Sequence, residues 1–180
     1  FIMFNKIIDF WFNELEPKQW WQKDDGLDAQ IKTRFGELHH QASVSELFGW
    51  RESALGSLAE IIVLDQFSRN IYREKPAAFA CDALALALAQ AAIAKGFDKE
   101  LTDEQRVFLY MPFMHSESKL IHDEAVKLYK ALGIKNNLDF EYQHKAIIDR
   151  FNRYPHRNKI LGRDSTKEEL EFLKQPNSGF

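Results

Sequence analysis

Apolar residues recur every three or four positions along most of the chain, which is the spacing of one face of an α-helix. After Asp24 this spacing places on one stripe Leu27, Ile31, Phe35 and Leu38. We therefore predict a helix from Asp24 or Asp25 to about Ala42, with His39 and His40 on its solvated face. The period of two that is typical of strands is nearly absent, so the predicted class is all-α.

Residues that begin, end or break helices divide the chain further. Asn5 is a candidate N-cap of a first helix that Pro17 ends, and the spacing from Thr102 to Gln105 is that of a capping box. We expect Pro112 to kink or end the helix that Thr102 begins. Other predicted helices span residues 55–72, 83–94, 116–132 and 140–154.

Further capping signals set the ends of these helices. Asp82 is the predicted N-cap of the Ala/Leu-rich run, and Ser116 that of the helix that follows Pro112. Gly96 and Gly133 stand where helices end, and a second capping box from Ser165 to Glu168 begins the last one. Seven or eight helices with short links predict a TPR-like array of antiparallel helical hairpins.

Composition sets the class of protein without naming an activity. The 180 residues are 45% hydrophobic and 28% charged, which predicts one globular domain over residues 1–180. A net charge of −3 without an obvious basic face argues against a nucleic-acid partner. No apolar run approaches the roughly 18 residues of a membrane span, so we expect no membrane partner. The single cysteine, Cys81, suits a reducing cytoplasm.

The first candidate site lies on a segment that otherwise reads as a buried helix. From Leu55 to Tyr72 the helix is apolar nearly all round, yet five polar residues share one arc of its C-terminal half: Asp65, Gln66, Arg69, Asn70 and Arg73. One interpretation is a buried ion pair of Asp65 with Arg69, four residues apart. The other is that the arginines present forked donors to a carboxylate or phosphate.

The second candidate site is the arginine-rich stretch from residue 150 to 163. Its predicted ligand-binding residues are Arg150, Arg153, Arg157 and Asn158, and its predicted acid or base is His156. Cations near a helix C-terminus also interact favourably with the helix dipole, so Arg150 and Arg153 alone have a purely structural interpretation. The residues that follow Pro155 point more strongly to an anion site.

The third candidate is the junction after Pro112. His115 is a candidate general base with Glu117 as its partner, while the capping role predicted for Ser116 needs no chemistry. No His-Glu-x-x-His spacing, paired Cys/His spacing, nucleophile elbow or glycine-rich phosphate loop is present. We therefore predict no metal and no cofactor.

Several motifs carry a resemblance to a known family. They are the stretches 65–73, 78–82, 111–117 and 150–163, within a likeness that runs from Phe10 to Phe180. Together they resemble a bacterial family of uncharacterised proteins with a TPR-like, all-helical fold, in which Ser68 stands where proline is typical. The resemblance implies this fold and no established activity, and it assigns no role to the polar positions of the motifs.

Three functions stay open at the level of sequence. The favoured one is the binding of an anionic small molecule or peptide in a pocket rich in Arg, His and Asp. The first alternative is an enzyme that uses His115 or His156 as a general acid or base on an anionic substrate. The second is a structural or protein-interaction module with a buried ion-pair network. The oligomeric state is open.

Overall fold

The computed structural model describes residues 3–180, and over this range the chain is built from α-helices with short 3₁₀ and π-helical segments and contains no strand. The all-α prediction is confirmed. The chain divides into two compact units, each described here by itself. Unit 1 comprises the residues up to Arg73 together with Ala77–Pro112, and unit 2 comprises Glu74–Pro76 and Phe113–Phe180. The prediction of a single domain over residues 1–180 stays a prediction.

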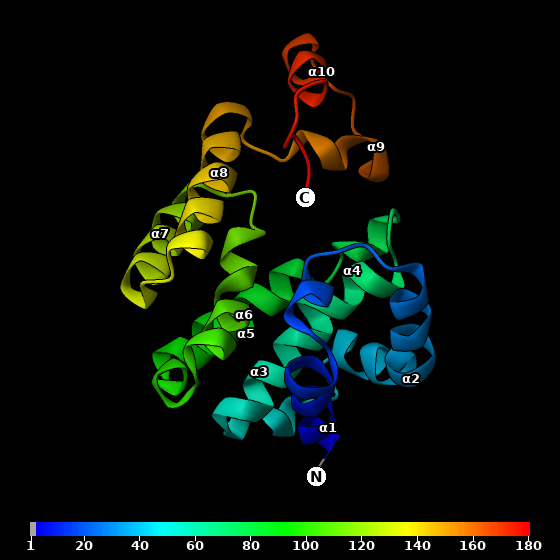
Figure 1. The fold of residues 1–180 in the computed structure, drawn as a ribbon, viewed down its shortest axis with the longest axis vertical. Coiled ribbons are helices and arrows are strands. Elements are labelled where there is room, and N and C mark those ends of the chain that lie inside the picture. The colour runs from blue at the N-terminus through cyan, green and yellow to red at the C-terminus, as the bar shows by residue number, and fades with distance from the viewer. Residues whose placement is uncertain (1–2) are drawn as a thin grey trace. The chain divides into compact units, whose positions relative to one another are not determined.

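Unit 1 is organised around a buried helical segment that changes its winding part of the way along. Its α-helices are α1 (Met3–Asp9), α2 (Asp25–Ser43), α3 (Ala54–Ile62), α4 (Ser68–Ile71), α5 (Asp82–Ala94) and most of α6 (Asp103–Met114) (Figure 1). Two π-helical segments, Phe10–Glu14 and Val63–Phe67, continue α1 and join α3 to α4. Short 3₁₀ helices span Pro17–Trp20, Phe48–Glu52, Pro76–Ala78 and Phe97–Glu100.

The core of unit 1 forms where α3 and the π-helix after it pack against α1, α2 and α5. Every residue from Gly56 to Ser68 is buried. Aromatic rings fill the space between the helices: Phe35 stacks on Phe67 at a centroid distance of 5.3 Å, and Phe10 meets both rings edge-on. Burial of such rings stabilises the unit by removing large apolar surfaces from water.

Unit 2 contains α7 (Lys119–Leu132), α8 (Lys135–Phe151), α9 (Asn158–Leu161) and α10 (Lys167–Leu173), with a 3₁₀ helix at Pro155–Arg157. Helices α7 and α8 form a hairpin (Figure 1). Gly133 ends α7 in the left-handed conformation with φ 81°, as its position in the sequence predicts. The core of this unit is formed by Ile147, Ile148 and Tyr154, with Phe151 and Phe172 packed against them.

Some of the predicted helix caps are confirmed. Asp24 caps α2 by accepting a hydrogen bond from the N–H of Leu27. Thr102 and Gln105 form both hydrogen bonds of the predicted capping box. Gly96 follows α5 with φ 75°.

Other predicted caps are wrong because a neighbouring residue takes the position. Asn5 lies inside α1, and Cys81 precedes α5 while Asp82 turns its carboxylate to Arg69. Ser118, two residues after the predicted Ser116, caps α7. The last capping box is formed by Thr166 and Glu169, one residue later than predicted.

Two breaks in the helices also differ from the prediction. Pro112 does not end its helix, because α6 continues to Met114. The predicted helix over residues 55–72 is interrupted by the π-helix at Val63–Phe67.

One apolar segment is longer than the sequence analysis expects. Residues Pro76–Ala94 form a helical stretch of 19 residues with a mean hydropathy of 1.8 in its most apolar window, of which 28% is buried. Length and composition alone would allow this segment to cross a membrane, which is weak evidence. Its α-helical part, α5, has 13 residues, or roughly 20 Å at 1.5 Å per residue, against the roughly 30 Å of a bilayer core.

Candidate functional site

The five predicted polar residues of unit 1 lie together, at the π-helix and α4. Asp65 is buried, with 1% of its surface exposed, and its Oδ2 accepts a hydrogen bond of 2.8 Å from Gln66. Arg69 lies 3.7 Å from Asp65 Oδ1, but its closer partner is Asp82, which its Nη1 and Nη2 bind at 2.8 and 3.0 Å. The predicted pair of Asp65 with Arg69 is thus present as the longer of two interactions.

The other two polar residues of this group share a different carboxylate. Asn70 donates to Asp28 Oδ1 at 2.9 Å, and Arg73 binds Asp28 through Nε and Nη2 at 2.6 and 2.9 Å. Both arginines of the first candidate site therefore already hold an aspartate in a bidentate manner. Sequence spacing did not identify either aspartate, because Asp28 lies on α2 and Asp82 on α5.

A buried hydrogen-bonded chain lies beside this group. The Ser68 hydroxyl donates to the carbonyl of Leu64 at 2.5 Å and therefore accepts from His39 Nε2, which lies 2.7 Å away. Burial lowers the pKa of His39 and raises the pKa of the Cys81 thiol, so both groups are held neutral. His39 is 4% exposed, and its predicted place on a solvated face is wrong because α2 turns this position toward Ser68.

In unit 2 the polar residues converge on Tyr154, whose side chain is fully buried. The Tyr154 hydroxyl donates to the carbonyl of Met114 at 2.5 Å. The guanidinium carbon of Arg157 lies 4.7 Å from the centre of the Tyr154 ring, and the His156 ring lies 5.6 Å from it. Arg157 also donates to the carbonyl of His115 at 2.9 Å. We call the residues that meet here the Tyr154 cluster: His115, Glu117, Tyr154, His156, Arg157 and Arg163.

Glu117 shows how this cluster holds a carboxylate. Its two oxygens accept from Arg163 Nη1 and Nη2 at 3.0 and 2.9 Å, and from the backbone N–H of Tyr154 at 2.9 Å. Burial alone would raise the pKa of Glu117. The hydrogen bonds from Arg163 and Tyr154 and the nearby charge of Arg157 outweigh it and lower the pKa below its usual value. The carboxylate is therefore ionised at neutral pH and held by cationic and backbone donors.

A buried pair of His122 and Glu141 supports the cluster from the side of α7 and α8. Both side chains have no exposed surface, and His122 Nδ1 lies 2.8 Å from Glu141 Oε2. His122 Nε2 lies 2.6 Å from the carbonyl of Ser116, so Nε2 carries a hydrogen and Nδ1 shares a proton with Glu141. Burial raises the pKa of Glu141, against the lowering effect of His122. This pair connects both helices of the hairpin to the segment before α7.

The remaining predicted residues of unit 2 have other partners than Glu117. Arg153 binds the two oxygens of Glu169 at 2.9 and 2.7 Å, and Asn158 donates to Ser165 at 3.1 Å while accepting from Arg163 at 3.0 Å. Arg150 pairs with Glu168 at the surface. The structure therefore brings together His115, Glu117, His156 and Arg157. It adds Tyr154 and Arg163, which belong to the arginine-rich stretch but were not among its predicted ligand-binding residues.

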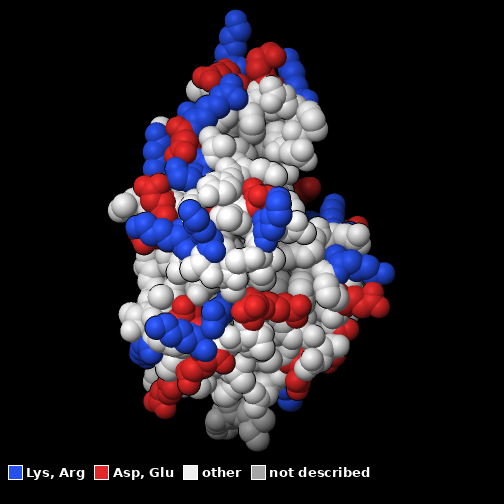
Figure 2. Space-filling model, turned by 60° about the vertical axis from the view of Figure 1, so that its left-hand side comes forward, with Lys and Arg blue, Asp and Glu red and all other residues white. Residues whose placement is uncertain are grey.

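No other part of the described chain offers a clearer site. Among residues 3–180 no group of three or more His, Cys, Asp or Glu side chains is placed to hold a metal ion. On the face drawn in Figure 2, basic and acidic side chains are interspersed.

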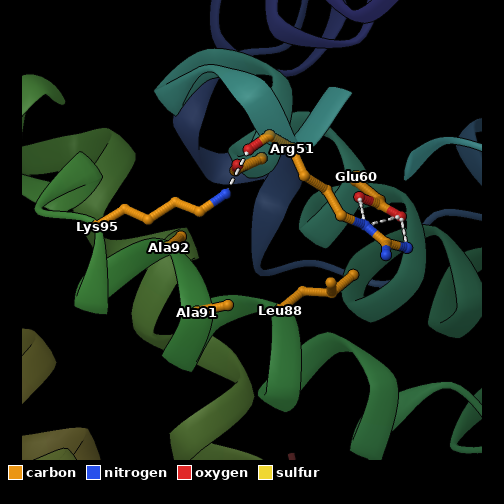
Figure 3. Close-up of a pocket in the computed structure, with 7 residues that line it drawn as sticks. Arg51, Glu60, Leu88, Ala91, Ala92 and Lys95 are labelled. Atoms are coloured by element: carbon orange, nitrogen blue, oxygen red, sulfur yellow. Dashed lines mark hydrogen bonds and ion pairs between the residues drawn. The ribbon is translucent and has the colours of Figure 1, made fainter. Parts of the chain in front are cut away.

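Figure 3 shows a hollow in unit 1 lined by Arg51, Ser57, Glu60, Leu88, Ala91, Ala92 and Lys95. Arg51 binds the buried Glu60 carboxylate at 2.7 and 2.9 Å, and Lys95 donates to the carbonyl of Arg51. Each charged group that lines the hollow therefore binds another residue of its lining.

The sequence and the all-α fold match a known class of bacterial protein. The family described as "Bacterial protein of unknown function (DUF924)" matches residues 7–177, and the chain belongs to this family. A solved structure of a protein of unknown function, ATU0120 from Agrobacterium tumefaciens, is 39% identical in sequence, with a TM-score of 0.91. The similarity covers 96% of this chain and 97% of that one. A comparison with curated proteins gives no match.

Proposed function

We propose that the protein binds an anionic small molecule or peptide at the Tyr154 cluster. The observation that carries the proposal is the Glu117 carboxylate, which Arg163 holds through two donors and Tyr154 through a backbone N–H. About a quarter of the Glu117 and Arg163 side chains is exposed, at 27% and 24%. A carboxylate or phosphate that enters here would take the place of the Glu117 carboxylate on donors that already hold a group of this kind.

Within the same proposal, the polar residues of unit 1 have a structural role. Arg69 and Arg73 each hold an aspartate through two donors, and Asp65 is almost fully buried. Freeing Arg69 for a ligand would leave the almost fully buried Asp65 without a cation, and an uncompensated buried charge costs about 3–5 kcal/mol. We propose that Asp65, Gln66, Arg69, Asn70 and Arg73 stabilise the fold and that the ligand binds in unit 2.

Acid–base catalysis by His115 or His156 is the second candidate function. The observation that favours it is that His156 and Glu117 both contact Tyr154, so an imidazole and a carboxylate lie near the proposed anion site. A binding protein and an enzyme differ in one measurable respect, which is turnover of the ligand once its class is known.

The wider setting of the protein is also a proposal. We propose a TPR-like arrangement of helical hairpins, supported by the α7–α8 hairpin, and a cytoplasmic protein without a nucleic-acid or membrane partner. The interspersed charges and the net charge of −3 support the exclusion of nucleic acid.

The test of the proposed function is a thermal-shift screen with acetate, phosphate, nucleotides and short acidic peptides. A ligand present at about 100 times its Kd should stabilise the protein by about 2.7 kcal/mol. We expect Arg157→Met to lose this shift, since methionine keeps a chain over the Tyr154 ring and removes the charge. Arg150→Met is the matched control, because Arg150 pairs with Glu168 at the surface.

Two results would contradict the proposal. One is a screen in which no anion shifts the wild-type protein. The other is a shift that is equally large in Arg157→Met and in the wild type, which would place the ligand elsewhere.

A further inference from the structure

The ring of Phe180 packs into a cradle of three other rings within unit 2. Its centroid lies 3.7 Å from that of His144, 4.9 Å from that of His156 and 5.5 Å from that of Tyr154. We call His144, Tyr154 and His156 the ring cradle. Phe180 remains 58% exposed, so it covers the cradle without being enclosed by it.

The His144 side of the cradle is an uncharged aromatic surface. Burial lowers the pKa of His144 to about 3, and its Nδ1 lies 2.6 Å from the carbonyl of Phe140. The imidazole is therefore neutral at pH 7 and donates from Nδ1, so a phenyl ring can stack on it without removing a charge from water. The hydroxyl of Tyr154 donates to the carbonyl of Met114. The Tyr154 ring meets the Phe180 ring edge-on, at an interplanar angle of 89°.

Gly179, the residue before Phe180, packs closely against His156 of the ring cradle. A Cβ added to Gly179 would lie 3.3 Å from the Cβ of His156, which is closer than ordinary contact. The absence of a side chain at position 179 lets the backbone approach His156 while the next residue places its ring on His144.

The ring cradle and the proposed anion site share Tyr154 and His156. The guanidinium of Arg157 lies 4.7 Å from the centre of the Tyr154 ring, and Phe180 lies 5.5 Å from the same ring. A surface for a phenyl ring and a set of donors for an anion thus lie within reach of one short molecule.

We propose that the ring cradle is the aromatic half of the anion site, so that the ligand class is an aromatic acid: a carboxylate joined to a phenyl ring by a short linker. Phe180 occupies the aromatic half and competes with the ligand for it. This inference rests on the proposed function, because the Tyr154 cluster must bind the anionic half. A free aryl carboxylate and a peptide that ends in phenylalanine share this chemistry.

The test is isothermal titration of the wild type and of Phe180→Ala with 3-phenylpropionate, hexanoate, propionate and an acetylated tripeptide that ends in phenylalanine. If Phe180 fills the cradle most of the time, its removal should tighten 3-phenylpropionate about tenfold or more and leave propionate unchanged. Hexanoate, which has a similar chain length but no ring, should gain less affinity from the same substitution. Whichever of the tripeptide and 3-phenylpropionate binds with the higher affinity identifies the source of the aromatic acid.

Tyr142→Ala is the matched control, since Tyr142 is also an exposed aromatic residue of unit 2, at 47% exposure. It should leave every affinity at the wild-type value. Phe180→Leu keeps an apolar side chain and should give an intermediate gain, which checks that the effect does not come from misfolding.

Separate outcomes decide the inference and the proposed function. If propionate and 3-phenylpropionate bind but Phe180→Ala gains nothing, or gains equally for hexanoate, the aromatic half is overturned and the anion site stands. If no anion binds any variant, the proposed function fails. A titration with benzyl alcohol then tests the ring cradle by itself. Binding to Phe180→Ala but not to the wild type would support the ring cradle as a site for a phenyl ring, and no binding to either would overturn it.

Discussion

Glu169, at the start of α10, has both carboxylate oxygens engaged. They accept from Arg153 at 2.7 and 2.9 Å and from the N–H of Thr166 at 2.9 Å. The hydrogen bond from Arg153 is the largest of the effects that lower the pKa of Glu169 to about 2. The side chain of Glu168 next to it is 64% exposed and pairs with Arg150 in solvent. Two neighbouring glutamates thus have very different environments.

Glu169→Gln is expected to lower the free energy of unfolding by about 1.5–3 kcal/mol, because it weakens charge-assisted hydrogen bonds to a largely buried group. Glu168→Gln should change it by less than about 1 kcal/mol, as for other exposed ion pairs. Urea unfolding of both variants at neutral pH checks the difference. Equal losses would show that the arrangement of donors around Glu169 adds no stability.

The partners of single residues are what local sequence patterns do not predict. Helical spacing selected Arg69 and Arg73, and the arginine-rich stretch selected Arg153, as candidate ligand-binding residues, which stays a prediction. Their partners lie 13, 45 and 16 residues away, and no spacing rule connects residues on different helices. Arg157, His115 and Glu117 meet for the same reason, because α7 and α8 fold back on each other between them.

At the scale of elements, the approach of α3 to the 3₁₀ helix Phe48–Glu52 depends on one glycine. A Cβ on Gly56 would lie 2.1 Å from the carbonyl oxygen of Trp50, so any side chain there would push the two elements apart. Gly36 on α2 has no atom within 4 Å of the same position.

Gly56→Ala is therefore expected to lower the free energy of unfolding by about 3 kcal/mol or more, because overpacking against backbone cannot relax by a side-chain rotation. Gly36→Ala should raise it by about 0.5–1 kcal/mol through the higher helix propensity of alanine. Thermal unfolding of both variants, followed by circular dichroism, gives the two opposite shifts. A Gly56→Ala protein as stable as the wild type would contradict the close approach.

The sequence predicted most helices, because apolar periodicity is a local signal and α2, α5 and α8 each bury one face. It missed the π-helix at Val63–Phe67, since all of these residues are buried and five residues are too few for periodicity to distinguish a π-helical turn from an α-helical one. It ended α6 too early because Pro112 removes one hydrogen bond, and the packing of buried Phe113 and Met114 outweighs that loss.

At the scale of the whole molecule, each unit contains a buried neutral histidine. Burial lowers the pKa of His39 in unit 1 and, with a value of about 3, that of His144 in unit 2, from an ordinary 6.5. A group whose folded pKa is lowered binds its proton more readily in the unfolded chain. Its contribution to stability is therefore present above pH 6.5 and is lost as the pH falls below that value.

We expect the free energy of unfolding to fall between about pH 7 and pH 5, with each of these histidines adding up to about 1.4 kcal/mol per pH unit. Urea unfolding at several pH values measures the slope. The double variant His39→Gln and His144→Asn should flatten it, whereas His40→Gln, at an exposed position of α2, should change it less, because the charge of His40 is a smaller cause than burial of the lowered pKa of His39. An unchanged slope in the double variant would assign the pH dependence to other groups.

The winding of the segment after Ile62 also bears on how this fold tolerates changes in chain length. A π-helical turn holds one residue more than an α-helical turn, and a residue added to or removed from a helix rotates everything beyond it by about 100°. In residues 63–67 the wider turn accommodates that extra residue. Within it Gln66 donates to Asp65, and beyond it Arg69 still reaches α5. A protein that lost one residue here would keep an unbroken helix but would turn Arg69, Asn70 and Arg73 away from their aspartates. The number of residues at this point is therefore constrained by the ion pairs.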